Sequence, residues 1–476
     1  MKLKRKLFIA AILFCTNNFL QAQLKLPYFF SDDMVLQQQT DANIWGWAKA
    51  GATIKITTSW NNQHFTATTN SNGKWQLKVP TPVAGGPYEL TISDGKPITL
   101  HNVMIGEVWL CSGQSNMEMP MKGFKNSPII GSNEAILHSA NKNIRLYIVP
   151  RSGKKEPQDT SKASPWKEAS PEAVSNFSAT AYFFGRELSN MLNVPIGLID
   201  VSYGGSFAQA WMSAGTLQPL DELKDAPKSD TIKIPNRTVT ALYNGMLHPV
   251  IGYTIKGAIW YQGETNYDFP DKYEKLFTAM VKEWRSEWGI GDFPFYFAQI
   301  APYDYAQLPP YNAGGKFNSA YLRDAQRKSL KTIPNSGMIS LMDIGEQKSI
   351  HPMHKLEGGE RFAMLALSDA YGKKGFTGAC PVYDSMNISG NIINLVFHNT
   401  PNGLTSFGKD LSQFEIAGAD KYFVPAQAVI TAKGVAVSSP NVKQPVAVRY
   451  AFKDFVVGDL FSNEGLPVSS FRTDDW

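Results

Sequence analysis

The sequence has little cysteine: only three of its 476 residues are cysteines, and one of these, Cys15, lies within the first 22 residues. Cys111 and Cys380 alone make no disulfide framework, so we expect hydrophobic cores to stabilise the fold. Charged residues are also few at 18%, whereas hydrophobic residues make up 43%, which excludes a disordered chain or a coiled coil. The length exceeds one ordinary core and predicts roughly two to four domains.

A large excess of positive charge is missing as well. The formal net charge is +5, and four of the positive charges lie at the N-terminus, on Lys2, Lys4, Arg5 and Lys6. Because no basic field remains beyond them, the sequence disfavours nucleic-acid binding.

The N-terminus has the order of a secretory signal. The basic residues are followed by an apolar run over residues 7–14 and by Leu20-Gln21-Ala22, which suits cleavage after Ala22. We therefore expect a signal peptide over residues 1–22 and a periplasmic or secreted protein. The run is shorter than the ~20 residues that span a bilayer, and no later segment approaches that length without charges, so no membrane span is expected.

The rest of the chain divides into three regions. Residues 23–103 and 380–476 contain short alternating stretches between Gly- and Asn-rich turns, which predict two antiparallel β modules. Residues 104–379 alternate apolar strands with helical patterns, which predict a parallel sheet covered on both faces. The expected fold class is α/β, with a parallel-sheet core flanked by β-sandwich-like modules.

Five core strands are expected, at residues 107–111, 196–201, 255–261, 295–300 and 338–342. Ligands of open α/β sheets bind at the carboxyl ends of the strands. Four of these ends carry chemically capable groups, namely Gln114-Ser115, Gly204-Gly205, Gln262 with Glu264 and Asn266, and Asp343 with His351. Together they offer a nucleophile, oxyanion donors and a base on one rim.

The order of serine, amide block and histidine along the chain resembles that of the SGNH hydrolases, which have a flavodoxin-like core. The sequence is more closely similar to the sialate O-acetylesterase family. Six blocks carry this resemblance: FSDDMVLQ at 30–37, LCSGQSNME at 110–118, LYNGMLHP at 242–249, WYQGE at 260–264, IHP at 350–352, and NEGLP at 463–467 with FRT at 471–473. The resemblance implies an exported esterase that removes O-acetyl groups from sialic acids or other acetylated sugars, without metal or organic cofactor.

The resemblance also implies roles for individual residues. Ser115 resembles the nucleophile and His351 the base. The backbone N–H groups of Ser115 and Gly205, with Gln262 or Asn266 as a side-chain donor, resemble the oxyanion hole.

The third member of the catalytic triad departs from the SGNH pattern. These enzymes usually hold an aspartate three residues before the histidine, but Lys348 occupies that position here. Asp343 is our assignment for the acid that orients His351, and Glu346, or a backbone carbonyl in a Ser–His dyad, remain open alternatives.

Substrate specificity must come from contacts between the protein and the sugar, because an acetyl group is small. We expect Gln114 and Glu264 to bind substrate, and Tyr203, Trp211 and Tyr267 offer aromatic faces for stacking, with core packing as the alternative for Trp211. For the carboxylate of a sialic acid the candidates are Arg323 and Arg449, although such side chains more often pair within the protein.

Other functions compete with this interpretation. His351 and His354 suggest a metal-dependent hydrolase, which Pro352 between them disfavours. Glu264 and Asp343 suggest a glycosidase with paired carboxylates, which leaves Ser115 without a role. Esterases of acetylated plant glycans such as xylan, and a non-catalytic carbohydrate-binding protein, are further alternatives. The sequence does not indicate the oligomeric state.

Overall fold

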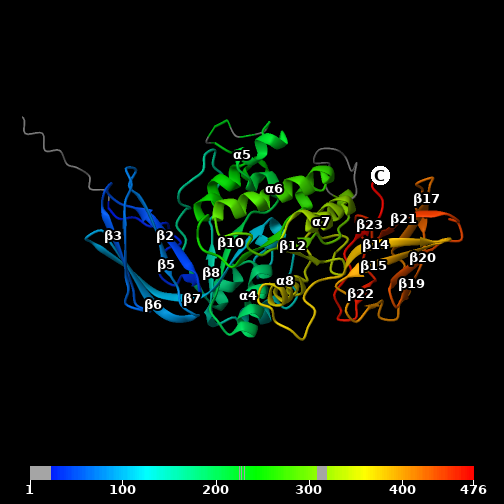
Figure 1. Ribbon diagram of the computed structural model, residues 1–476, viewed down its shortest axis with the longest axis horizontal. Helices are drawn as coiled ribbons and strands as arrows, with labels where there is room; N and C mark the ends of the chain where they lie inside the picture. Colours follow the sequence, from blue (N-terminus) through cyan, green and yellow to red (C-terminus); the bar gives the residue numbers. More distant parts are fainter. Residues whose placement is uncertain (1–22, 225, 227, 230, 308–318) are drawn as a thin grey trace, which may run out of the picture.

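The computed structural model describes all residues except 1–22, 225, 227, 230 and 308–318, so the expected signal peptide lies outside the described residues. Figure 1 shows an elongated molecule with N-terminal strands at one end, an α/β part in the middle and C-terminal strands at the other end. This architecture confirms the predicted fold class. In the described residues, no helix is long and apolar enough to cross a membrane.

The central sheet has the strand order β13-β12-β11-β7-β10-β8-β9, and all neighbours pair in parallel except the edge strand β9. The five predicted strands are all present, and β8 and β9 extend the sheet. The bounds are β7 Pro97–Gly113, β8 Asn141–Ile148, β9 Lys167–Ala169, β10 Ile196–Ser202, β11 Gly257–Tyr261, β12 Phe295–Gln299 and β13 Ser336–Ser340.

Four longer helices cover this sheet, and they pack as two pairs, α4 with α8 and α6 with α7. Their bounds are α4 Ala179–Leu192, α6 Pro270–Trp288, α7 Ala320–Thr332 and α8 Lys355–Asp369. The helical patterns expected at residues 181–192 and 273–284 correspond to α4 and α6. The short helices are α1 Ser115–Glu118, α2 Ser132–Leu137, α3 Pro171–Ser175 and α5 Ala214–Leu217.

Strand β7 belongs to two sheets. Its first residues pair with β6 and β1 of the N-terminal module, and residues 107–113 pair with β10. The domain border expected between residues 103 and 104 therefore falls inside one continuous strand. The N-terminal strands are β1 Val35–Gln37, β2 Asp41–Trp47, β3 Thr53–Thr58, β4 His64–Thr68, β5 Lys74–Pro80 and β6 Gly85–Ser93.

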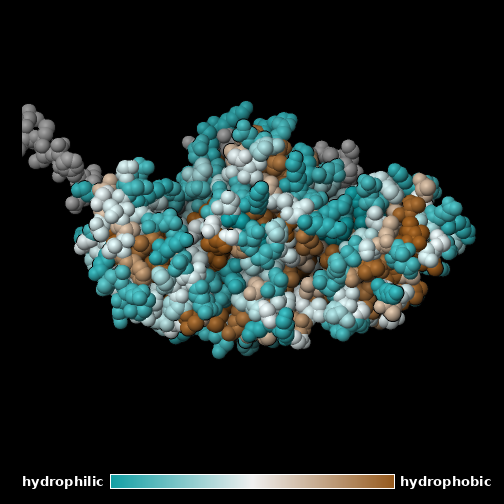
Figure 2. Space-filling view, in the orientation of Figure 1, coloured by the Kyte–Doolittle hydropathy of each residue, from teal (hydrophilic) through white to brown (hydrophobic). Residues whose placement is uncertain are grey.

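The C-terminal module contains two four-stranded antiparallel sheets, β14-β15-β20-β19 and β18-β17-β21-β23, and the pair β16-β22. Their bounds are β14 Val382–Ser389, β15 Ile392–His398, β16 Leu404–Thr405, β17 Phe414–Gly418, β18 Val424–Pro425, β19 Gln427–Thr431, β20 Gly434–Ser438, β21 Pro445–Tyr450, β22 Phe461–Ser462 and β23 Phe471–Arg472. Hydrophilic residues cover much of the face seen in Figure 2.

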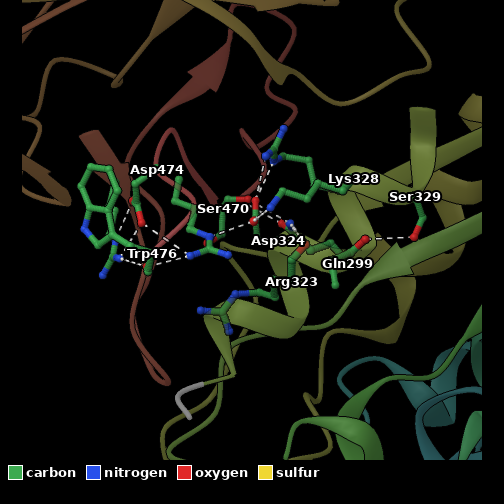
Figure 3. Close-up of polar contacts among 12 residues, drawn as sticks. Gln299, Arg323, Asp324, Lys328, Ser329, Ser470, Asp474 and Trp476 are labelled. Carbon is green, nitrogen blue, oxygen red and sulfur yellow. Dashed lines mark hydrogen bonds and ion pairs between the residues drawn. The ribbon is translucent and has the colours of Figure 1, made fainter. Parts of the chain in front are cut away.

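Buried charges join this module to the core (Figure 3). Asp324 of α7, 1% exposed, lies 2.7 Å from Arg327, 3.0 Å from Lys328 and 3.0 Å from Arg472 of β23. Burial alone would raise the pKa of Asp324, but Arg327 and Lys328 hold it below its ordinary value. Arg472 lies in the FRT block, so this C-terminal motif contributes to docking of the module.

Candidate active site

The nucleophile turn begins where β7 ends. Gly113 has φ 144°, and a Cβ atom there would lie 2.1 Å from the carbonyl oxygen of Tyr261, so only glycine fits this close approach. The chain then enters α1, and the N–H groups of Met117 and Glu118 donate to the carbonyl of Gln114. This turn places the half-buried Ser115 at the edge of a pocket of about 330 Å³.

The pocket brings together residues from four strand ends. Six of the predicted site residues line it: Gln114, Ser115, Gly205, Glu264, Tyr267 and His351. The other lining residues are Gly204, Phe207, Arg237, Thr265, Asp268 and Ile350.

The backbone N–H groups of Ser115 and Gly205 both lie in this pocket, and neither has an acceptor among the described residues. Gly205 has φ 66°, a left-handed conformation that favours glycine. The preceding Gly204 lies against the nucleophile, since a Cβ atom there would lie 3.4 Å from that of Ser115, and its N–H donates to Glu118 at 2.7 Å. The loop therefore leaves two unpaired donors beside the serine, as an oxyanion hole requires.

Gln262 and Asn266 do not lie at the pocket surface, which corrects their assignment as oxyanion donors. Both are fully buried. The amide nitrogen of Gln262 donates to the carbonyl of Ser206 at 3.0 Å and to Oδ1 of Asn266 at 2.7 Å. Asn266 in turn accepts from the N–H of Ala208 and donates to Gln209. These two amides brace the loop that follows β10.

Gln114 is the side chain that we had not considered as an oxyanion donor. Its Oε1 atom accepts hydrogen bonds from the N–H groups of Gly263 and Thr265, both at 3.2 Å. This fixes the amide so that Nε2 is the free end, and Nε2 has no acceptor within the described part of the chain. Gln114 thus lines the pocket with its oxygen held and its nitrogen free to donate. Nothing in the sequence indicates this role, because it depends on which end of the amide is hydrogen-bonded.

His351 lies in the loop between β13 and α8. Its ring packs edge-on against the ring of Phe124, with 5.3 Å between the two ring centres. Burial, together with the positive charge of Lys355, lowers the pKa of His351 to about 4. The imidazole is therefore neutral at ordinary pH, which suits a general base. No hydrogen bond joins its ring nitrogens to another described group.

Neither candidate acid contacts the ring of His351. Both carboxylate oxygens of Asp343 accept from Arg361 of α8, at 2.8 and 2.6 Å. Glu346 accepts from the N–H of Met353 at 2.6 Å. The structure thus does not support Asp343 as the acid of a triad, and it fits the Ser–His dyad. Asp343 also does not line the pocket with Glu264, which removes the carboxylate pair of the glycosidase alternative.

The aromatic predictions divide. Trp211 is fully buried and packs on Trp260, so core packing, not sugar stacking, explains it. Tyr203 does not line the pocket, and the guanidinium of Arg151 covers its ring at 4.4 Å. Tyr267 does line the pocket, and so does Phe207, which we had not predicted.

The two arginines predicted for a substrate carboxylate do not line the pocket. Arg323 is buried and donates to the backbone carbonyl of Lys453 in the C-terminal module, and Arg449 pairs with Asp474 at 2.7 Å. Neither is placed to bind a substrate carboxylate. His354, the second histidine of the metal alternative, lies 2.7 Å from Glu357.

Comparison with known proteins agrees with this geometry. Residues 105–367 match the family model described as carbohydrate esterase, sialic acid-specific acetylesterase. The chain is similar to proteins named sialate O-acetylesterase from Pongo abelii, at 27% identity over 89% of this chain and 86% of that one, and from Homo sapiens, at 28% identity over 78% and 76%. A solved carbohydrate acetylesterase from Xanthomonas citri is 34% identical, covers 95% of this chain and 100% of its own, and superposes with a TM-score of 0.86. These matches confirm the resemblance noted in the sequence: the chain belongs to the carbohydrate esterase family of the sialic acid-specific acetylesterases.

Proposed function

We propose that this protein removes O-acetyl groups from sialic acids through an acetyl-serine intermediate. The observation that carries the proposal is the shared pocket of Ser115, His351 and the unpaired N–H groups of Ser115 and Gly205. The choice of sialic acid as the substrate rests on the names of the relatives, which are sialate O-acetylesterases.

The reaction proceeds in two steps. His351 takes the proton of Ser115 as Oγ bonds to the acetyl carbonyl carbon, and the resulting oxyanion is bound by the backbone N–H groups and by Nε2 of Gln114. The ester C–O bond then breaks, and His351 returns the proton to the leaving sugar oxygen. In the second step His351 deprotonates water, which attacks the acetyl-enzyme and releases acetate and the free serine.

The pocket lining offers partners for a sialic acid. Phe207 and Tyr267 contribute aromatic side chains to the lining, and Arg237 contributes a guanidinium group. We place the carboxylate of the sugar beside Arg237, since guanidinium groups suit carboxylates. An Arg237→Gln variant should raise KM for O-acetylated sialic acid and leave KM for a neutral acetyl ester unchanged.

The test is acetate release by the purified protein and its Ser115→Ala variant, from O-acetylated sialic acid and from acetylated xylo-oligosaccharide in parallel. We expect the wild type to release acetate from O-acetylated sialic acid and the Ser115→Ala variant to release none. Preference for the xylo-oligosaccharide would reassign the substrate to plant glycans. Release by Ser115→Ala equal to that of the wild type would refute the serine mechanism, and no release from either sugar would favour a binding protein.

We also propose that the protein is exported, on the basis of the signal-like residues 1–22. The mature chain should then begin at Gln23. N-terminal sequencing of the protein from its native host tests this, and a chain that retains Met1 in the cytoplasm would refute it.

A further inference from the structure

Beneath the catalytic pair lies a buried polar unit that the mechanism above does not use. It consists of Asn116 of α1, Glu264 in the short turn of helix that follows β11, and Lys355, the first residue of α8, which are 1%, 3% and 3% exposed. These three residues come from the three segments that carry the nucleophile, the amide block and the base.

Asn116 joins the three segments through one amide. Its nitrogen donates to Oε1 of Glu264 at 2.5 Å and to the carbonyl of Ile350 at 3.0 Å, and its oxygen accepts from Nζ of Lys355 at 2.5 Å. Ile350 immediately precedes His351, and Asn116 immediately follows Ser115. The amide therefore links the backbone beside the nucleophile to the backbone beside the base.

The unit also holds charge in a place where charge is costly. Lys355 begins a helix, whose positive end disfavours an ammonium group, and its Nζ lies 5.6 Å from the centre of the Tyr261 ring. Burial lowers the pKa of Lys355 to about 7, against the opposing effect of Glu264 and Glu346. Burial likewise raises the pKa of Glu264, which the hydrogen bond from Asn116 and the charge of Lys355 oppose.

We propose that Asn116 and Lys355 are positioning residues, which with Glu264 hold the loop of His351 against the nucleophile turn in place of the missing triad acid. Nζ of Lys355 is joined through the amide of Asn116 to the carbonyl of Ile350, the residue before His351, so its positive charge is held beside the base. Of the charged groups around this position, Glu264 and Glu346 face Lys355, and Lys355 is the cation that acts on His351. The proposal rests on the proposed esterase function.

Kinetics of two variants test the geometric part. Asn116→Ala and Lys355→Met should each lower kcat for 4-nitrophenyl acetate, by ~10²-fold for Asn116→Ala since a misplacement of ~1 Å has that effect, with little change in KM. The double variant should lose no more than the worse single variant, because both substitutions break one unit. If Asn116→Ala does not fold, Asn116→Asp of equal size takes its place, with thermal unfolding as the check.

The pH profile tests the electrostatic part, which a merely structural role would not move. Removal of the ammonium in Lys355→Met should shift the acid limb of kcat/KM upward by roughly one unit, since a nearby positive charge disfavours the imidazolium. Lys348→Met is the matched control, because Lys348 is an exposed cation three residues before His351, and its acid limb should coincide with that of the wild type.

Two results would overturn the inference: a kcat of Asn116→Ala equal to that of the wild type, or an unmoved acid limb in Lys355→Met. In both cases the wild type would still be an active esterase. Failure of the proposed function is distinct, because then the wild type itself releases no acetate or Ser115→Ala retains its activity.

Discussion

The side-chain donor of the proposed oxyanion hole can be removed while its surroundings are kept. In a Gln114→Glu variant, Oε1 still accepts from the N–H groups of Gly263 and Thr265, which lie at 3.2 Å in the wild type. The amide nitrogen, however, becomes a carboxylate oxygen. The variant therefore lacks the third donor and adds negative charge where the tetrahedral oxyanion forms.

The expected loss follows from the role of the donor. Loss of one oxyanion donor lowers kcat by ~10²–10³, or ~2.7–4 kcal/mol of transition-state stabilisation. Charge repulsion should place Gln114→Glu at the upper end of this range, and the neutral Gln114→Met should lie at the lower end. KM should change little, because the interaction forms in the transition state. Steady-state kinetics with 4-nitrophenyl acetate measure both constants.

A kcat of Gln114→Glu within a few-fold of the wild type would refute this reasoning. It would show that Gln114 only braces the turn at Gly263, since glutamate preserves both accepted hydrogen bonds. Gln262→Glu is the matched comparison. Its two donated hydrogen bonds end inside the protein, and Asn266 keeps the N–H of Ala208 as a second donor. This variant should therefore lose ~1–3 kcal/mol of stability, because the buried carbonyl of Ser206 is left unpaired, and thermal unfolding measures the loss.

Three further outcomes are expected. The acid limb of kcat/KM should lie near pH 4, because the pKa of His351 is lowered to about 4 and only neutral imidazole accepts the proton; a limb near the ordinary value of ~6.5 in a pH–rate profile would contradict the burial argument. Asp324→Asn should lower the free energy of unfolding by ~3–5 kcal/mol, since it leaves the buried guanidinium of Arg327 without its carboxylate, and denaturant melts that match the wild type would contradict this. Burial raises the pKa of Asp200 from 3.8 to about 8, so folding takes up a proton between these values and stability falls as pH rises through that window; Asp200→Asn, which cannot ionise, should lose this dependence in urea melts across the same pH range.

The core strands were predictable because they are buried on both faces. Residues 196–202 and 257–261 are buried throughout, and apart from Asp200 and Ser202 they are apolar, which is typical of a strand covered on both faces. Strand β8 escaped prediction because it begins with the polar residues Asn141, Lys142 and Asn143. The border expected between residues 103 and 104 has no turn to mark it, because β7 continues through it.

The site was predictable to the level of strand ends but not to the level of side-chain direction. Gly263 has φ 153°, a turn that separates residues close in sequence. Gln262 before the turn is directed into the protein and bonds to Ser206, whereas Glu264 after it lines the pocket. Gln114 and Gln262 both follow strand ends, and only the hydrogen-bond pattern distinguishes the donor from the brace.

Asp343 helps to fix one end of the loop of His351 and does not contact the imidazole ring. An aspartate in a triad orients the imidazole directly, but here Asp343 is used to fix α8 to the end of β13 through Arg361, which also donates to the carbonyl of Ser340 at 2.9 Å. At its other end the same loop is held through Ile350 by Asn116. With both ends tethered, the position of His351 does not depend on a carboxylate against its ring. The absence of such a carboxylate from its described contacts also accounts for its pKa, since nothing there offsets burial and the charge of Lys355. Side-chain tethers at both ends thus hold the loop of His351 where SGNH enzymes usually rely on an acid, and they leave His351 a weaker base that is neutral at ordinary pH.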